Sequence, residues 1–376
     1  MNREMGNALK CVMVAGSLLF PITEVIPQEF NGELSGLTRA VDNGSTSNPV
    51  TFGLRYIPTF YMEFSSTEKN HIDFEISGNL TSSYQIVSAN SSTDASNFKA
   101  YRFWLRYSTN RFESRLGLQK INFGPAKLLR ALRWFDSLDP QDPLQLAEGV
   151  YSLRLRYDFQ NNANIWIWGL YGNKDLKGME VISTRDKSPE YGVRFQYPIG
   201  NGEMAITSHN RVIDISGESI AENRIALDGV WDIGVGVFFE SAMIKTDKGD
   251  SNQNWQSFLT LGMDYTFGIG SGLTVLGEHL LFTVDDTPFG IATKKDISGL
   301  MMLYSIGLLD QLTYFSFYNW SENLPYHYVS WQRNYDLWIF HVSVFWSRGK
   351  NGSTKESQSL ASFGQKGIQL TIIFNH

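Results

Sequence analysis

Apolar and polar residues alternate along most of the chain. In residues 101–107, aromatic or aliphatic side chains occupy the odd positions, while Arg102 and Arg106 are among the residues at the even positions. The same alternation recurs in residues 151–159 and 338–346. Successive side chains of a β-strand point to opposite sides, so a period of two predicts strands with one apolar and one polar face. The chain is therefore expected to be all-β.

The connections between these segments alternate in length. Tight turns are expected near Asn110, Asn161, Gly200, Asp232, Gly270, Asp310 and Asn334. Longer polar links are expected at 89–96, 124–148, 173–189, 245–252, 284–295 and 347–361. Short turns at one end and long loops at the other are typical of membrane barrels, which have an even number of strands of roughly ten residues. We predict a transmembrane antiparallel up-and-down β-barrel of about 18 strands, with about 16 as the alternative.

The first segment has the organisation of a secretory signal. Arg3 and Lys10 make it basic, and the apolar stretch from Cys11 to Ile22 is shorter than the roughly 20 residues that a membrane-spanning helix needs. We expect residues 1–27 to be a signal peptide and residues 28–376 to form the barrel. The predicted location is the outer membrane of a Gram-negative bacterium, where the protein would be integral and would contact membrane lipid and lipopolysaccharide.

The last strand carries a further pattern. A polar residue, a glycine two positions later and alternating hydrophobic residues that end in an aromatic follow one another as Gln365, Gly367, Leu370, Ile372 and Phe374. This pattern resembles the β-signal that the barrel-assembly machinery reads, although Asn375 and His376 follow the aromatic residue here. The resemblance implies that this machinery and periplasmic chaperones are partners during biogenesis.

Two sets of charged residues fall on the polar faces of the expected strands. The basic set consists of Arg102, Arg106, Arg115, Arg154 and Arg156. The acidic set, on the tenth to thirteenth strands, consists of Asp228, Glu240, Asp264 and Glu278. Neighbouring strands lie about 4.8 Å apart, so each set would line one wall of the lumen, and opposed walls would set up a transverse field. The alternative is that these charges pair with strand neighbours, as Arg106 or Arg115 could with Glu113.

The link at 124–148 has features of its own. Apolar residues and the cations Lys127, Arg130 and Arg133 recur with a helical period over Ala126–Leu138, and Pro125 suits the first position of a helix. We therefore predict a helix in this link. The link either folds into the lumen and constricts it, or caps the external rim, and the pattern leaves both readings open.

The residues before this link show a local resemblance. The stretch from Arg115 to Gly124 contains G-x-Q-x-x-x-F-G and is followed by the segment Asp139 to Pro143. It resembles porin-like outer-membrane barrels that carry G-x-Q-x-x-x-W/F-G before a long inserted loop, such as alginate-export-type barrels and uncharacterised Bacteroidota barrels. The resemblance implies a barrel channel but names no substrate.

Catalytic and metal sites are not apparent. Ser208 and His209 are neighbours in an expected strand, so their side chains point to opposite faces and cannot form a triad with Asn210. Asp136, Asp139 and Asp142 recur every three residues without the glycine and glutamate of an EF-hand loop. We expect no metal and no cofactor, and the net charge of −6 argues against binding of nucleic acid.

The sequence thus predicts a porin-like channel for passive or weakly selective passage of small polar or anionic solutes, and not an enzyme. One alternative is a structural or adhesion barrel with a plugged lumen. The other is a barrel hydrolase that assembles its site from distant strands.

Overall fold

The computed structural model describes residues 28–42, 48–66, 69–88, 91–136, 142–215, 217–247, 254–347 and 366–376. The predicted signal peptide, residues 1–27, and Gln365 lie outside the described residues. The strands are β1 (Gln28–Asp42), β2 (Val50–Ser66), β3 (Asn70–Ser88), β4 (Ser91–Thr109), β5 (Phe112–Gln119), β6 (Val150–Asp158), β7 (Asn164–Leu170), β8 (Glu190–Ile199), β9 (Gly202–Ile215), β10 (Glu218–Asp232), β11 (Gly236–Thr246), β12 (Trp255–Phe267), β13 (Leu273–Asp285), β14 (Thr293–Ile306), β15 (Asp310–Asn319), β16 (Leu324–Asn334), β17 (Trp338–Ser347) and β18 (Lys366–Asn375).

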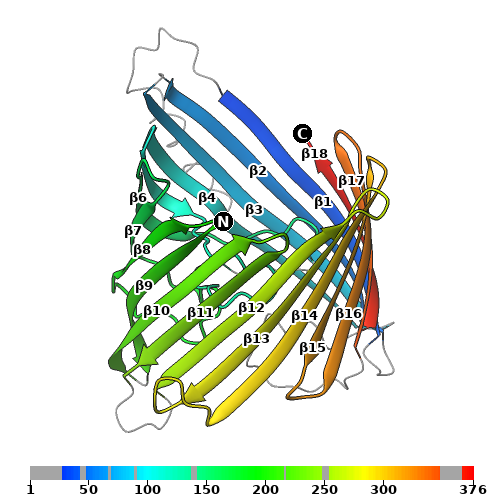
Figure 1. Ribbon diagram of the computed structural model, residues 1–376. Helices are drawn as coiled ribbons and strands as arrows, with labels where there is room; N and C mark the ends of the chain where they lie inside the picture. Colours follow the sequence, from blue (N-terminus) through cyan, green and yellow to red (C-terminus); the bar gives the residue numbers. More distant parts are fainter. Residues whose placement is uncertain are drawn as a thin grey trace.

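These strands form one closed ring (Figure 1). Each strand pairs antiparallel with its neighbours in the chain, and β1 pairs with β18 through a register that runs from Glu33 opposite Asn375 to Asp42 opposite Lys366. Closure removes the unpaired edges that an open sheet would expose. The prediction of an 18-stranded up-and-down barrel is confirmed. Among the described residues, no helix is long and apolar enough to cross a bilayer.

The two faces of the ring differ as the alternation predicted. On β4, Phe103 and Leu105 are exposed on the outside, whereas Arg102 and Trp104 are buried on the inside. Outward residues elsewhere in the ring include Leu116, Leu153, Tyr191, Ile206, Ile225, Leu227, Leu261, Val344 and Leu370. Such a continuous apolar surface is unfavourable in water and matches the hydrocarbon region of a membrane.

The link predicted at 89–96 is wrong, because β4 already begins at Ser91. Residues 92–100 of β4 are all exposed, so this part of the strand is exposed on both of its faces. Their serine, threonine and asparagine content therefore reflects a strand that meets water on both faces. Composition alone could not distinguish such a strand from a loop.

The closing strand β18 holds four of the five residues of the predicted assembly signal. Leu370 is exposed on the outside, and the ring of Phe374 lies 4.7 Å from that of Trp338 on β17, centre to centre. Gly367 faces inward, where an added Cβ would lie 2.5 Å from the carbonyl oxygen of Ala40 and from the ring of Phe345. The glycine of the pattern is thus required by the close packing of β1, β17 and β18.

Candidate functional site

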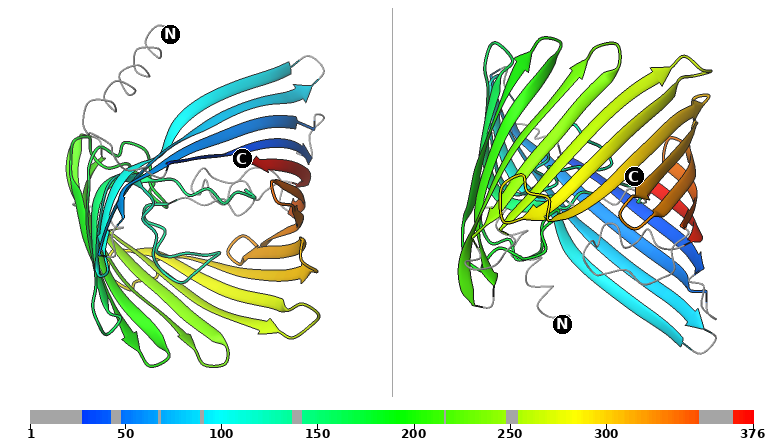
Figure 2. Two further views of the ribbon diagram at one scale, coloured as in Figure 1. Left: turned by 90° about the horizontal axis from the view of Figure 1, so that it is seen from above. Right: turned by 60° about the horizontal axis from the view of Figure 1, so that its bottom comes forward.

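The described parts of the connection between β5 and β6, residues 120–136 and 142–149, run inside the barrel (Figure 2). The first of these parts is attached to β11. The backbone N–H groups of Ala126 and Leu132 donate to the two carboxylate oxygens of Glu240, each over 2.9 Å. Gly124 lies against the same carboxylate at φ +90°, and a Cβ there would come within 2.3 Å of Oε1. Only glycine allows this conformation together with this approach.

A second carboxylate holds the next turn of this loop. Glu278 on β13 accepts the backbone N–H groups of Lys127, Leu128 and Leu129 over 2.7, 3.0 and 2.5 Å. The hydroxyl of Thr260 on β12 donates to the carbonyl of Leu129 over 2.5 Å. The loop backbone is therefore bonded to three consecutive strands of the wall.

The helix predicted over Ala126–Leu138 is wrong for the described residues 126–136, which form turns and bends. A helix needs its N–H groups to donate to carbonyl groups four residues earlier. The N–H groups of Ala126 to Leu129 would be free at the start of such a helix, but Leu132 lies in its interior and its N–H donates to Glu240 instead. The three-residue recurrence of cations does not reflect helical structure.

Apolar side chains dock the same loop along the wall. Phe123, Trp134 and Phe135 form a buried cluster with Trp168 of β7. Leu129 belongs to a second buried cluster, whose other members come mainly from β14 to β17 and include Phe315, Phe317, Tyr326, Tyr328 and Phe345. The loop thus covers the wall from β7 round to β17.

The later part of the loop contacts the opposite wall. Asp142 accepts a hydrogen bond from Arg55 on β2 over 2.7 Å. The carbonyl of Ala147 accepts one from Arg102 on β4 over 2.8 Å, and Glu148 pairs with Lys99 over 2.9 Å. β2 and β11 are nine strands apart in the ring of 18, so the described parts of the loop contact both sides of the lumen.

The residues of the G-x-Q-x-x-x-F-G motif turn the chain from β5 into the lumen. Gly117 has φ +121°, and a Cβ there would lie 2.1 Å from the carbonyl oxygen of Phe103. The fully buried side-chain amide of Gln119 donates to the carbonyl groups of Arg115 and Ser152 over 2.8 and 3.1 Å. The motif therefore supports the exit of the loop from the wall.

The predicted basic residues lie side by side on the inner wall. Arg106, Arg115 and Arg154 are register partners across β4, β5 and β6. Carboxylates accompany them. Arg106 bonds Asp73 through two nitrogens over 2.8 and 2.7 Å, and Glu113 contacts Arg115 over 3.5 Å and also pairs with Arg154.

The two remaining arginines of this set differ in exposure. Arg156 pairs with Asp158 over 2.8 Å, and its side chain remains 39% exposed. Arg102 is buried and bonds the carbonyl groups of Tyr101 and Ala147. Pairing with strand neighbours, the alternative weighed from the sequence, thus occurs for most of this wall.

The three cations of the loop have different surroundings. The side chain of Lys127 is 56% exposed and lies 3.4 Å from Asp264. Arg130 is paired with Asp136 over 2.7 Å. Burial lowers the pKa of Arg133, and the positive charge of Arg130 lowers it further. Of the three, Lys127 is the cation that the loop presents to solvent.

The four predicted acidic residues do not share one environment. Glu240 and Glu278 hold the loop backbone, and Asp264 faces Lys127. Asp228 is buried and bonds Arg194 of β8 through both oxygens, over 2.6 and 2.7 Å. Two of the four residues therefore attach the loop, and each of the other two pairs with one cation.

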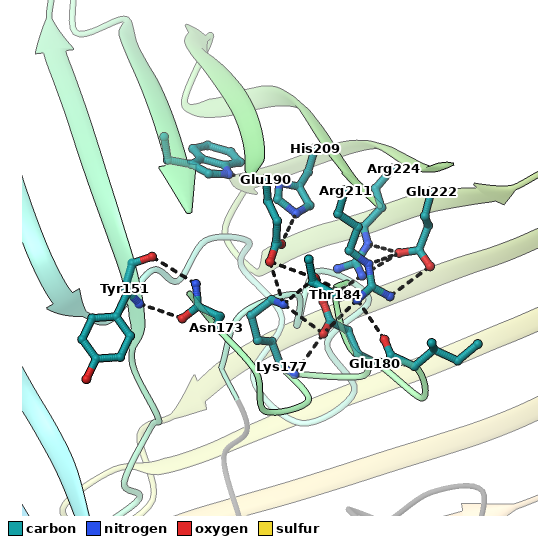
Figure 3. Close-up of polar contacts among 12 residues, drawn as sticks. Tyr151, Asn173, Lys177, Glu180, Thr184, Glu190, His209, Arg211, Glu222 and Arg224 are labelled. Carbon is teal, nitrogen blue, oxygen red and sulfur yellow. Dashed lines mark hydrogen bonds and ion pairs between the residues drawn. The ribbon is translucent and has the colours of Figure 1, made fainter. Parts of the chain in front are cut away.

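A buried ionic network, which the sequence prediction did not include, attaches the connection between β7 and β8, residues 171–189 (Figure 3). Glu180 contacts Lys177 over 3.2 Å and both Arg211 and Arg224 over 3.0 Å. The other members are Thr184, Glu190, His209 and Glu222. We call these eight residues the buried network. The only sequence signals for it are the inward pairs His209-x-Arg211 on β9 and Glu222-x-Arg224 on β10.

The same connection packs on the inserted loop. The N–H of Met179 donates to the carbonyl of Arg133 over 3.0 Å. Gly178 has φ +52°, and a Cβ there would lie 2.1 Å from that carbonyl oxygen. The buried network therefore holds residues 171–189 against the inserted loop at Arg133.

The imidazole of His209 is engaged by buried partners. Its Nδ1 accepts the indole N–H of Trp168 over 3.2 Å, and its Nε2 lies 3.1 Å from Glu190. Ser208 precedes it on the strand and points to the other face. In the part of the chain that the structure describes, no group of three metal-ligating side chains is found.

Comparisons with known proteins find similarity in structure. No family model matches the chain, and no curated protein matches its sequence. OccK7 (OpdD) of Pseudomonas aeruginosa is 9% identical with a TM-score of 0.57, covering 93% of this chain and 99% of that one. The outer membrane protein OprD of the same organism is 9% identical with a TM-score of 0.52, covering 93% of each chain.

A third similar structure is Wzi of Escherichia coli, described as an outer membrane protein involved in group 1 capsule assembly and as a carbohydrate-binding β-barrel. It is 11% identical with a TM-score of 0.51, covering 92% of this chain and 84% of that one. At these identities the likeness shows the fold, which is the porin-like barrel that the local sequence resemblance predicted.

Proposed function

We propose that the protein is an outer-membrane channel of a Gram-negative bacterium that passes small polar or anionic solutes with weak selectivity. The observation that carries this proposal is the arrangement of the lumen. A closed ring that is apolar outside holds an inserted loop against the wall from β7 to β17. The arginines of β4 to β6 lie outside this stretch of the wall, with Arg102 bonded to Ala147 in the later part of the loop, and they form the proposed filter together with Lys127.

The charge of this wall supports weak anion preference. Its five arginines are accompanied by the carboxylates Asp73, Glu75, Glu113 and Asp158. These nine groups, of which Asp73 and Glu75 belong to the neighbouring strand β3, sum to one positive charge. Fixed charges along a narrow passage raise the local concentration of counter-ions, so we expect a modest preference for anions.

The similar solved structures support the barrel fold, and one of them, OprD, is described as an outer membrane protein. The proposal also makes the chain a non-enzyme. We further propose that lipid and lipopolysaccharide surround the barrel, and that the barrel-assembly machinery and periplasmic chaperones read the pattern on β18 during biogenesis.

Conductance across planar lipid bilayers tests the proposal. Purified protein should give discrete current steps, and a salt gradient should give a reversal potential on the anion-selective side. Replacing the two most exposed cations of the proposed filter, as Lys127→Gln with Arg156→Gln, should move this potential towards cation selectivity. Lys294→Gln is the matched control, because Lys294 lies at the end of β14 beside Asp296 and away from the lumen wall. Absence of current steps would overturn the channel.

The second candidate is a plugged barrel with a structural, adhesive or carbohydrate-binding role. The observation that favours it is the extent of apolar packing between the loop and the wall. Wzi, a barrel of similar fold, is described as carbohydrate-binding. This candidate predicts no conductance and a partner that binds to the intact barrel, measured with immobilised protein and glycan or cell-surface ligands.

A further inference from the structure

Two buried carboxylates of the wall interact with the loop through backbone groups. The side chain of Glu240 is fully buried, and Glu278 is 4% exposed. Together they accept five N–H groups, all from residues 126–132 of the inserted loop. The two residues belong to β11 and β13, so they hold the loop at two points of the ring.

The dependence between loop and carboxylates is mutual. A carboxylate removed from water is unfavourable unless hydrogen bonds replace its solvent. A buried backbone N–H also needs an acceptor. If the loop left the wall, Glu240 and Glu278 would lose their donors, and the loop amides would lose their acceptors. Hydrogen bonds to a charged acceptor are about twice as strong as neutral ones, which favours the docked arrangement.

The attachment also fixes which side chains face the lumen. Lys127, Leu128 and Leu129 all donate to Glu278, yet Leu129 is buried in the cluster with residues of β14 to β17 while Lys127 is largely exposed beside Asp264. If residues 127–129 rotated about the chain axis, a leucine side chain would face the lumen in place of Lys127. The carboxylates therefore control both the position of the loop and the orientation of its one exposed cation.

We propose that Glu240 and Glu278 are positioning residues that set the aperture of the lumen and aim Lys127 into it, rather than members of an acidic wall that solutes contact. This assignment deepens the proposed channel function and rests on it. It predicts that loss of these carboxylates changes permeation without opening the ring, because the strand pairings β10–β11 and β12–β13 do not involve their side chains.

The first measurement reports loop position without requiring a channel. Ala131, which is fully buried in the loop, is replaced as Ala131→Cys, and Cys11, the only cysteine of the sequence, as Cys11→Ser. A hydrophilic maleimide should label this reporter slowly in the parent and at least about tenfold faster with Glu240→Ala and Glu278→Ala. Glu203→Ala, at an exposed site at the start of β9, is the matched control and should leave the rate unchanged.

The second measurement is single-channel conductance of the same variants. Removal of both carboxylates should raise the mean step size and broaden its distribution. Gly124→Ala should act in the same way while keeping both carboxylates, because its Cβ would meet Glu240. The pair Glu240→Gln and Glu278→Gln is a milder change, because it removes the charges and keeps the side-chain volume. For every variant, heat-modifiable electrophoretic mobility checks that the barrel is folded and closed.

The outcomes separate the two proposals. Faster labelling without conductance in any form of the protein would support positioning and overturn the channel. Conductance in the parent with labelling and step size unchanged in the folded double variant would overturn positioning and leave the channel intact. Unchanged labelling in Gly124→Ala would contradict the close contact with Glu240.

Discussion

Removing the carboxylate of Glu180 should release residues 171–189 from the inner wall. Glu180 is fully buried and contacts three cations: Lys177, Arg211 and Arg224. Glu180→Ala leaves Glu190 and Glu222 to balance these three cations, so one buried positive charge is uncompensated. Taking one partner from a buried ion pair costs roughly 3–5 kcal/mol. We expect the lower end, about 3 kcal/mol, because Arg211 and Arg224 still bond Glu222.

Hydrogen exchange measures this release locally. The amide of Met179 donates to the carbonyl of Arg133 only while the connection is docked, so its exchange rate reports opening. A loss of about 3 kcal/mol corresponds to a rise of roughly 10²-fold in that rate. The wall residues of the network carry two positive and two negative charges, and Lys177 and Glu180 carry one of each. The double replacement Lys177→Ala with Glu180→Ala therefore restores balance and should exchange more slowly than Glu180→Ala alone.

Two results would refute this reasoning. If Glu180→Ala leaves exchange at Met179 unchanged, the network does not hold the connection. If the amide of Met179 exchanges faster in the double variant than in Glu180→Ala, the uncompensated charge is not the cause of the release of residues 171–189. Glu203→Ala, which removes an exposed carboxylate at the start of β9, controls for the loss of a glutamate as such.

Two other substitutions test the packing of the loop connections and the orientation of the outer face. Gly178→Ala places a Cβ 2.1 Å from the carbonyl oxygen of Arg133 at a φ of +52°, so the hydrogen-exchange rate of the Met179 amide should rise in this variant as well. The control is Gly217→Ala, where a Cβ meets nothing within 4 Å, and it should leave the exchange rate at Met179 unchanged. Leu227→Arg puts a charge on the outer face of β10 and should lower the free energy of unfolding in lipid bilayers by about 2–4 kcal/mol, as measured in denaturant. An equal stability of Leu227→Arg and the parent would contradict the outward, lipid-facing orientation of this strand.

The ring could be predicted because its signal is local. Alternation such as that in residues 101–107 follows from the pleat of each strand and does not depend on distant contacts. The link predicted at 89–96 was wrong for a physical reason, since a strand with water on both faces has no apolar side. Strand prediction from alternation therefore depends on one face being covered.

The inserted loop shows the opposite case. Its backbone donors find their acceptors on residues 108 to 151 positions away, and no local pattern contains that information. Lys127 and Arg130 recur with a helical period, yet one meets solvent and the other pairs with Asp136. The inward placement of Glu240 and Glu278 was predictable from strand parity. Their contact with amides was not, because backbone groups carry no sequence signature.

The closed network around Glu180 and the open cations at Lys127 and Arg156 would respond differently to dissolved salt. Ions screen exposed charges over about 8 Å at physiological strength, but they do not reach groups that protein surrounds on every side. A rise in salt concentration would therefore weaken the selectivity between solutes at concentrations that still leave residues 171–189 attached to the wall. The same lumen thus separates charges that the environment can tune from charges that it cannot.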